Sequence, residues 1–149
     1  MTTTIAIQAE DFDLADEIAA LTTGASDIGA VASFVGHVRG DDGLTALILE
    51  HYPAMTRAEI ARIVGDAMER WPLAAITVIH RIGRLEPGAQ IVLVAVASAH
   101  RGAAFAACEF LMDFLKTTAP FWKQEERGRA ISWVEPRSSD DEAATRWRK

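Results

Sequence analysis

The stretch Ile91-Val-Leu-Val-Ala-Val-Ala-Ser-Ala-His-Arg-Gly102 runs from seven consecutive apolar residues into a polar corner. Residues 90–97 predict a buried, central β-strand, because almost no polar side chain interrupts them. Residues 102–118 predict an amphipathic helix, and Pro120 prevents it from continuing. The aromatic residues that follow Pro120 are expected to lie in a loop. The buried stripe of the helix is predicted to contain Phe105, Cys108, Leu111, Met112 and Leu115.

Nitrogen-bearing side chains gather at both ends of this predicted helix. Free backbone N–H groups at its N-terminus suit an anion, which Arg101 can clamp and to which His100 can donate. Beyond its C-terminus, Lys116 and Lys123 flank an aromatic pair that offers a platform for a flat heterocycle or a partner's chain. The alternatives are a histidine that closes the sheet, a solvated arginine, a lysine favoured by the helix dipole, and aromatic core anchors.

The remaining sequence predicts an α+β fold with a mixed or antiparallel sheet, because short turns join neighbouring strands. Residues 28–38 and 44–52 are expected to pair as a hairpin around the turn Gly40-Asp-Asp-Gly43, with Arg39 at its tip. Gly36 predicts a bulge or a close approach of another backbone. Further strands are predicted at 3–8, 74–82 and 130–135, with a turn-bearing connection at 83–88. Helices are predicted to begin at Asp13, at Thr56 with Glu59, and at Ser139 with Glu142.

Composition limits the function. The 149 residues are expected to form one domain, 1–149, and the net charge of −6 argues against a nucleic-acid-binding surface. Residues 1–50 hold nine acids and a single Lys or Arg, Arg39, so an anion site must use the C-terminal part. Neither a membrane-spanning run nor a secretory signal is visible, so we expect a cytoplasmic protein. Cys108 is alone, and His51 and His80 have no suitable partners at ligand spacing, so no metal site is expected.

Seven short motifs occur in order along the chain. They are Phe34-Val-Gly-His-Val-Arg39, Leu49-Glu-His-Tyr-Pro53, Arg70-Trp-Pro-Leu73, Val78-Ile-His-Arg-Ile-Gly83, Ser98-Ala-His-Arg101, Met112-Asp-Phe-Leu-Lys-Thr-Thr-Ala-Pro-Phe-Trp-Lys123 and Trp133-Val-Glu-Pro-Arg137. With these motifs, residues 28–147 resemble the large, catalytic subunit of molybdopterin synthase.

The resemblance implies an α/β-hammerhead fold with three to four helices and a homodimer within a heterotetramer. Each end of that assembly would bind a small ubiquitin-like sulfur-carrier subunit, whose C-terminal Gly-Gly thiocarboxylate enters the active site. The implied reaction is sulfur transfer to cyclic pyranopterin monophosphate, which forms the dithiolene of molybdopterin. It implies no cofactor.

The resemblance also implies roles for individual residues. Lys116 and Lys123 match the catalytic lysines, Lys116 at the carrier's C-terminus and Lys123 near the substrate or its negative charge. Phe34 and Met112 would line the pocket, and Arg137 would reach across the dimer. The substrate-binding residues implied are Arg39, His37, His100, Arg101, Arg137, Phe34, Met112, Gln124 and Glu125.

Two other classes of function stay open at this point. A non-catalytic paralogue would hold the carrier or a pterin without converting it. An unrelated phosphate-ester hydrolase would use His100 and Arg101 and would turn over without a protein partner, although the sequence offers it neither an activated nucleophile nor a metal site.

Overall fold

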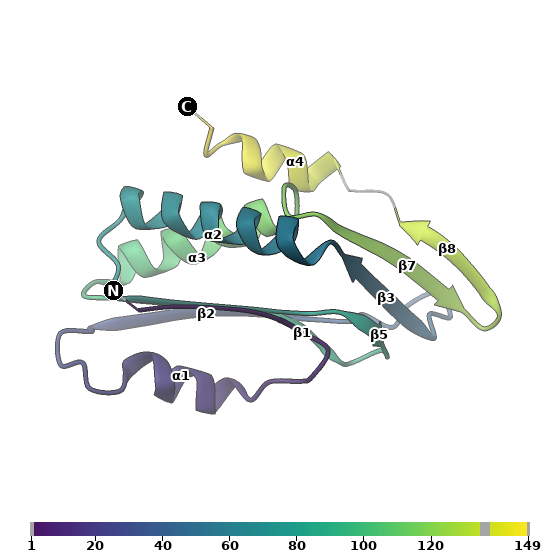
Figure 1. Ribbon diagram of the computed structural model, residues 1–149, viewed down its shortest axis with the longest axis horizontal. Helices are drawn as coiled ribbons and strands as arrows, with labels where there is room; N and C mark the ends of the chain where they lie inside the picture. The colour runs from purple at the N-terminus through teal and green to yellow at the C-terminus, as the bar shows by residue number, and fades with distance from the viewer. Residues whose placement is uncertain (1, 135–137, 149) are drawn as a thin grey trace.

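The computed structural model describes residues 2–134 and 138–148, which fold into two four-stranded sheets and four helices (Figure 1). The helices are α1 (Leu14–Thr22), α2 (Pro53–Arg70), α3 (Arg101–Leu115) and α4 (Ser138–Thr145). The strands are β1 (Thr2–Gln8), β2 (Ala30–His37), β3 (Ala46–His51), β4 (Ala75–Arg81), β5 (Gly83–Leu85), β6 (Gln90–Ser98), β7 (Phe121–Arg127) and β8 (Ala130–Val134).

The first sheet has the strand order β1-β4-β6-β2, in which β1 and β4 are parallel and the other pairs antiparallel. Helix α1 covers one face, while α2 and α3 cover the other (Figure 1). The strand β6 is central, as predicted, and is buried on both faces, which is why its sequence is continuously apolar. Val92, Val94 and Val96 join the core beside α2 and α3, while Leu93, Ala95 and Ala97 join the core beside α1.

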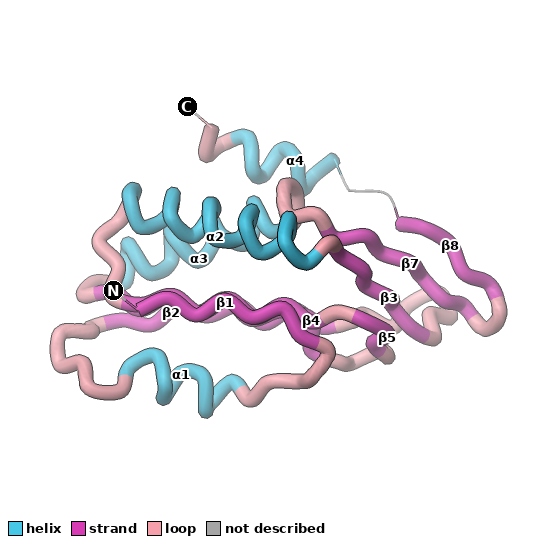
Figure 2. The backbone as a smooth tube through the Cα atoms, in the orientation of Figure 1, coloured by secondary structure: helices cyan, strands magenta, loops and turns pink. Residues whose placement is uncertain are grey.

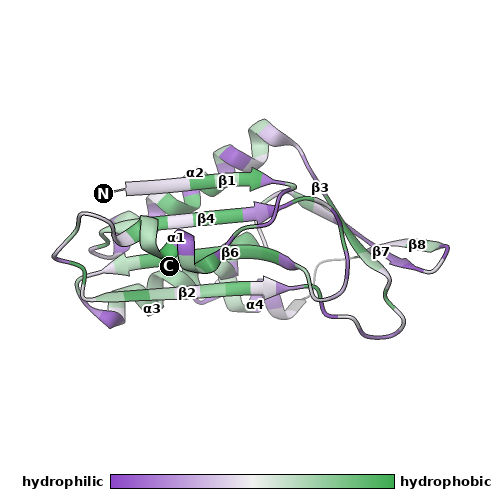
Figure 3. Cartoon of the chain, turned by 90° about the horizontal axis from the view of Figure 1, so that it is seen from below, coloured by the Kyte–Doolittle hydropathy of each residue, from purple (hydrophilic) through white to green (hydrophobic). Residues whose placement is uncertain are grey.

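The second sheet has the order β5-β3-β7-β8 and is antiparallel throughout. It extends from one end of the first sheet as an arm (Figure 2). Seen from below, the apolar colouring is concentrated on the strands of the first sheet, whereas the arm is mixed (Figure 3). A small core of Val38, Leu49 and Leu85 lies where the two sheets meet.

The predicted hairpin between 28–38 and 44–52 is wrong. The strand β2 pairs with β6, and β3 pairs with β5 and β7 in the other sheet. The turn after Arg39 therefore carries the chain from one sheet to the other. The turn residues predict a change of chain direction, but they do not predict which strand pairs with β2. Burial of β2 against β6 determines that pairing. The bulge predicted at Gly36 is confirmed by the register shift between Gly36 and His37.

The predicted aromatic loop after Pro120 is also wrong, because residues from Phe121 onward form β7. The charged residues of β7 remove the alternation of apolar and polar residues by which a strand is usually recognised in a sequence. Alternate side chains of β7 face a polar cavity rather than a dry core, so the usual contrast between apolar and polar positions is weak. The connection at 83–88 likewise contains the short strand β5.

Two helical predictions need correction. The helix α2 begins at Pro53, three residues before the expected cap Thr56, because proline at N1 suits a helix start. Thr56 instead lies in the first turn of α2. Its side chain is fully buried, and its hydroxyl donates to the Pro120 carbonyl at 3.4 Å. On α3 the predicted stripe is buried except for Phe105, which is 65% exposed.

The expected fold class is confirmed: the described residues form an α+β structure with mixed and antiparallel sheets and four helices. The cap predicted at Asp13 is also present, with its carboxylate accepting from the Asp16 N–H at 3.0 Å. Among the described residues, no helix is both long and apolar enough to span a bilayer.

Candidate active site

Two adjoining cavities lie at the C-terminal end of α3, where the arm meets the first sheet. They enclose about 460 and about 280 Å³. Six residues from five segments line both, so one wall is common to the two cavities. We call this set the shared wall: His37, Leu47, Ile91, Lys116, Phe121 and Lys123.

The smaller cavity lies at the end of the apolar core between the first sheet and helices α2 and α3. Phe34 reaches it from β2, His80 from β4, and Met112 and Leu115 from the last turn of α3. Gly36 helps to keep it open, because a Cβ there would lie 2.9 Å from Cγ1 of Val92. The result is a smaller recess in which apolar side chains from β2, β6 and α3 face the histidines and lysines that complete its lining.

The larger cavity is charged. It is lined by four Lys or Arg side chains and three carboxylates, of which Asp140 comes from α4. Two of the carboxylates are engaged within the cavity, since Asp41 pairs with Arg39 at 3.0 Å and Glu125 pairs with Arg127. The Arg39–Asp41 pair is well exposed, so it contributes little to stability and can exchange for a ligand's oxygens, whereas the Arg127–Glu125 pair is half-buried. The four cations are Arg39, Lys116, Lys123 and Arg127.

The two lysines reach the shared wall by different routes. Lys116 is the C-cap of α3, and its backbone N–H donates to the Met112 carbonyl at 3.1 Å. Lys123 stands on β7 opposite Leu49 of β3 and Val134 of β8. One lysine is therefore fixed by the end of a helix and the other by a sheet with neighbours on both sides.

His80 is not among the residues predicted for the site and is considered from the sequence only as a metal ligand, yet it lines the smaller cavity. Its ring stacks on Phe121 with centroids 3.8 Å apart and planes inclined by 15°. The pKa of His80 is lowered to about 4, mainly by burial and also by the positive charges of Lys123, Lys116 and His51, while the hydrogen bond to the Arg81 carbonyl opposes this shift. The alternation of Ile76, Val78 and His80 along β4 was the available sequence signal, since it places His80 on the helix-facing side.

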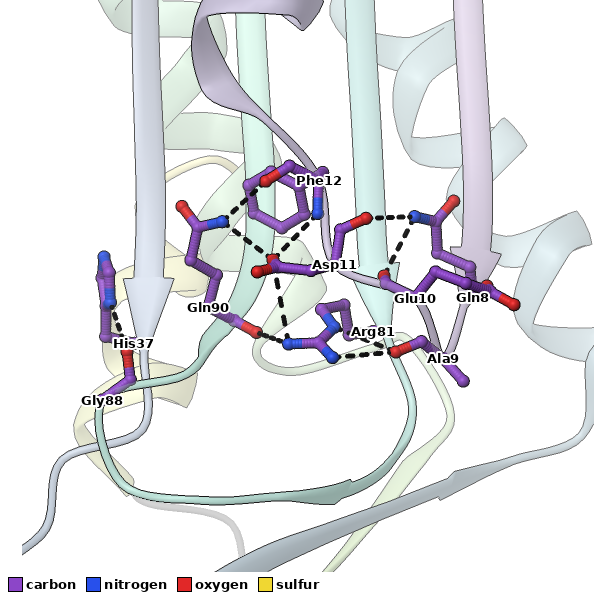
Figure 4. A network of polar contacts seen from close by, with 9 residues as sticks. All are labelled: Gln8, Ala9, Glu10, Asp11, Phe12, His37, Arg81, Gly88 and Gln90. Atoms are coloured by element: carbon purple, nitrogen blue, oxygen red, sulfur yellow. Dashed lines mark hydrogen bonds and ion pairs between the residues drawn. The ribbon is translucent and has the colours of Figure 1, made fainter.

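A hydrogen-bond network braces the first sheet beside His37 (Figure 4). Arg81 donates to the Ala9 carbonyl at 2.9 and 3.1 Å and to the Gln90 carbonyl at 3.0 Å. The Gln90 amide donates to Asp11 at 2.8 Å and lowers the pKa of that carboxyl. His37 itself donates from Nδ1 to the Gly88 carbonyl at 3.2 Å. This network holds the segment before α1 against the strand that pairs with His37.

The structure brings together most of the predicted site residues: Phe34, His37, Arg39, Met112, Lys116, Lys123 and Glu125 line one or both cavities. Gln124 does not, because strand alternation turns it to the face opposite Lys123. His100 and Arg101 are exposed at the N-terminal end of α3, about 22 Å along the helix from Lys116. Arg137 lies outside the described residues.

Within the described residues, no cluster of His, Cys, Asp or Glu could hold a metal ion. Cys108 is buried on α3, and desolvation raises its thiol pKa to about 11, so it is unsuited to act as a nucleophile. The chemistry of the site therefore belongs to its lysines, arginines and histidines, which suit anion binding, proton transfer and stabilisation of negative charge.

Comparison with known proteins identifies the family. The family model described as MoaE protein matches residues 7–118. The chain belongs to the MoaE family. A molybdopterin synthase catalytic subunit from Mesorhizobium japonicum is 58% identical over 97% of this chain and 93% of its own length. The expected resemblance is thus confirmed.

Solved structures of the MoaE family have the same fold. The molybdopterin biosynthesis MoaE protein from Burkholderia ambifaria is 52% identical, with a TM-score of 0.85, over 99% of this chain and 98% of that one. Molybdopterin synthase from Staphylococcus aureus is 31% identical, with a TM-score of 0.78, over 89% of this chain and 96% of that one. These matches confirm the expected hammerhead-type fold of the catalytic subunit.

Proposed function

We propose that this MoaE-family chain transfers sulfur from the C-terminal thiocarboxylate of a small ubiquitin-like carrier to cyclic pyranopterin monophosphate. The observation that carries the proposal is the shared wall, on which Lys116 and Lys123 line two cavities of different character. A reaction between two molecules needs two receptor sites that meet at the catalytic groups.

The properties of the two cavities support a division between the reactants. The larger one, with Arg39, Arg127 and both lysines, suits a phosphate and a polar pterin. The smaller one has apolar walls on one side and the two lysines on the other, which suits an extended Gly-Gly tail that ends in an anionic group. In each transfer the thiocarboxylate sulfur forms a C–S bond to a carbon of the substrate as a C–O bond at that carbon breaks, and the departing oxygen takes up a proton or stays on the phosphate. Water then cleaves the acyl–sulfur bond, and the carrier leaves as a carboxylate.

The two lysines have different tasks in this scheme. Lys116 lies at the junction of the cavities and assists by acid–base or electrostatic means as the carrier's acyl–sulfur bond breaks. Lys123 stabilises the negative charge of the substrate. His80, being neutral, adds no competing positive charge beside them.

His100 and Arg101 remain candidates for gripping the substrate, although they lie at the opposite end of α3 from Lys116. They can reach the same substrate molecule only if a second copy of the chain brings the start of its α3 to this pocket. We therefore propose a homodimer that shares residues between its two sites, with one carrier bound at each, acting in the cytoplasm.

Reconstitution tests this function against the non-catalytic alternative. The chain is mixed with thiocarboxylated carrier and pyranopterin precursor, and the product is identified by mass spectrometry. A sulfur transferase yields a product with two added sulfur atoms, whereas a binding paralogue holds carrier or pterin and leaves the precursor unchanged.

A further inference from the structure

The stack between His80 and Phe121 joins the two sheets behind the shared wall. His80 is only 7% exposed and belongs to β4 of the first sheet, whereas Phe121 belongs to β7 of the arm. Phe121 lines both cavities and His80 lines the smaller one. The close, nearly parallel contact of the two rings therefore joins β4 of the first sheet to β7 of the arm, next to both cavities.

The orientation of the His80 ring is fixed by one hydrogen bond. Its Nδ1 lies 2.8 Å from the carbonyl oxygen of Arg81. A carbonyl can only accept, so Nδ1 must carry the hydrogen, and Nε2 of the neutral ring carries none. A single tautomer in a single orientation results.

The groups around His80 favour this neutral form. Lys123 of β7, Lys116 at the end of α3 and His51 of β3 all contribute positive potential at the ring. Phe121 has His51 as its register partner on β3, but the His51 ring is tilted by 33° at 6.1 Å and does not stack. His80 is therefore the ring that stacks on Phe121.

We propose that His80 is a positioning residue for the sulfur transfer, acting through the ring of Phe121 to set the places of Lys116 and Lys123 on the shared wall. Phe121 and Lys123 are two residues apart on β7, so their side chains share one face of the strand. Lys116, at the end of α3, lines both cavities together with Phe121 and Lys123, so the three side chains belong to one wall. The inference rests on the proposed function.

Two substitutions separate the stack from the hydrogen bond. His80→Phe keeps a flat, neutral ring but loses the bond to the Arg81 carbonyl. His80→Asn keeps a donor for that carbonyl but loses the ring. Since a displacement of about 1 Å costs on the order of 100-fold in rate, we expect kcat to fall at least about tenfold in His80→Asn and to stay within about threefold of wild type in His80→Phe. The KM for the carrier should change little in either.

Initial steady-state rates are measured over a range of thiocarboxylated-carrier concentrations, at a temperature at which each variant is folded by its unfolding curve. His51→Phe is the matched control, because it alters the other ring beside Phe121 without touching either cavity, and its kcat should equal that of wild type. If His80→Asn fails to fold, His80→Leu replaces it, filling the space without a flat ring. A role in folding alone would lower Tm and leave kcat of the folded variant intact, which overturns the proposal.

A double-mutant cycle with Phe121→Leu tests whether His80 acts through that ring. The rate loss of His80→Asn should largely disappear in the Phe121→Leu background. Additive losses, or a His80→Phe variant as slow as His80→Asn, would mean that the imidazole acts by itself and would overturn the proposal. Wild-type turnover in the same assay is the reference: if wild type forms no product, the proposed function fails, whereas the positioning role fails only when wild type is active.

Discussion

At the scale of single residues, the site depends on which side chains are charged. Lys116 and Lys123 stand beside a buried histidine whose neutrality follows from desolvation first and from neighbouring positive charge second. A protonated His80 would repel both lysines and so favour their displacement from the shared wall. The burial of His80 therefore keeps a further positive charge away from the two lysines of the shared wall.

This burial makes stability depend on pH. The pKa of His80 is about 4 in the folded chain and near 6.5 in the unfolded chain. The unfolded state therefore takes up a proton first as pH falls, so stability is complete above about pH 6.5 and is lost progressively toward pH 4. We expect a loss of about 3 kcal/mol across this window, measured as the free energy of unfolding in denaturant. His80→Phe should remove that part of the slope, and equal slopes in the two proteins would contradict the assignment.

At the scale of secondary-structure elements, the bulge in β2 shapes the wall of the smaller cavity. A Cβ at Gly36 would lie 2.9 Å from Cγ1 of Val92 and 3.4 Å from Cε1 of Phe34. We expect Gly36→Ala to lower the free energy of unfolding by about 1–2 kcal/mol and to displace Phe34. Gly65→Ala is the matched control, since nothing lies within 4 Å of a Cβ there, inside α2. That change should stabilise by about 0.5–1 kcal/mol, and a destabilisation equal to that of Gly36→Ala would refute the crowding argument.

The terminal helix α4 is docked by Trp147, two residues beyond its end. The Trp147 indole donates to Asp113 at 2.6 Å and packs edge-on against Trp71 and Phe110, with centroids 5.7 and 5.6 Å away. We expect Trp147→Ala to cost about 2 kcal/mol, less than a fully buried Trp because this side chain is half-buried. Trp133→Ala, at a side chain 60% exposed, should change stability by less than about 0.5 kcal/mol. Denaturant unfolding measures both, and similar losses would show that Trp147 is not the docking residue.

The elements that the sequence predicts well are those buried on one or both faces. The strand β6 and the buried face of α3 follow from apolar patterning that burial enforces. The strand β7 and the partners of β3 could not be predicted in this way, because the charged face of β7 lines a cavity and strand pairing depends on non-local contacts.

At the scale of the whole molecule, the predicted site residues divide into those that one chain assembles and those that it does not. The motifs containing Phe34, Arg39, Lys116 and Lys123 converge on the cavities as the resemblance implied. The spatial role of His80 was missed because a lone histidine in a strand carries no local signal of stacking. The separation of Arg101 from Lys116 follows from the predicted helix between them, but sequence order does not say whether one chain's pocket can use both residues.

Mixing two inactive variants tests whether sites are shared between copies. In a dimer of one Lys116→Ala chain and one Arg101→Ala chain, one site carries both defects and the other carries neither if Arg101 acts across the dimer. Random association of equal amounts should then restore about a quarter of wild-type activity. If Arg101 serves its own chain's pocket, every site carries one defect and the mixture stays as inactive as its components.

The central claim is that the shared wall transfers sulfur, and the mass of the product formed by Lys116→Ala tests it most directly. The variant is incubated with thiocarboxylated carrier and pyranopterin precursor beside the wild-type chain, after confirming that it still binds carrier. Wild type should give a product with two added sulfur atoms, and Lys116→Ala should leave at least about 99% of the precursor unconverted in the same time. Equal yields of the sulfur-containing product from the two proteins would contradict the account.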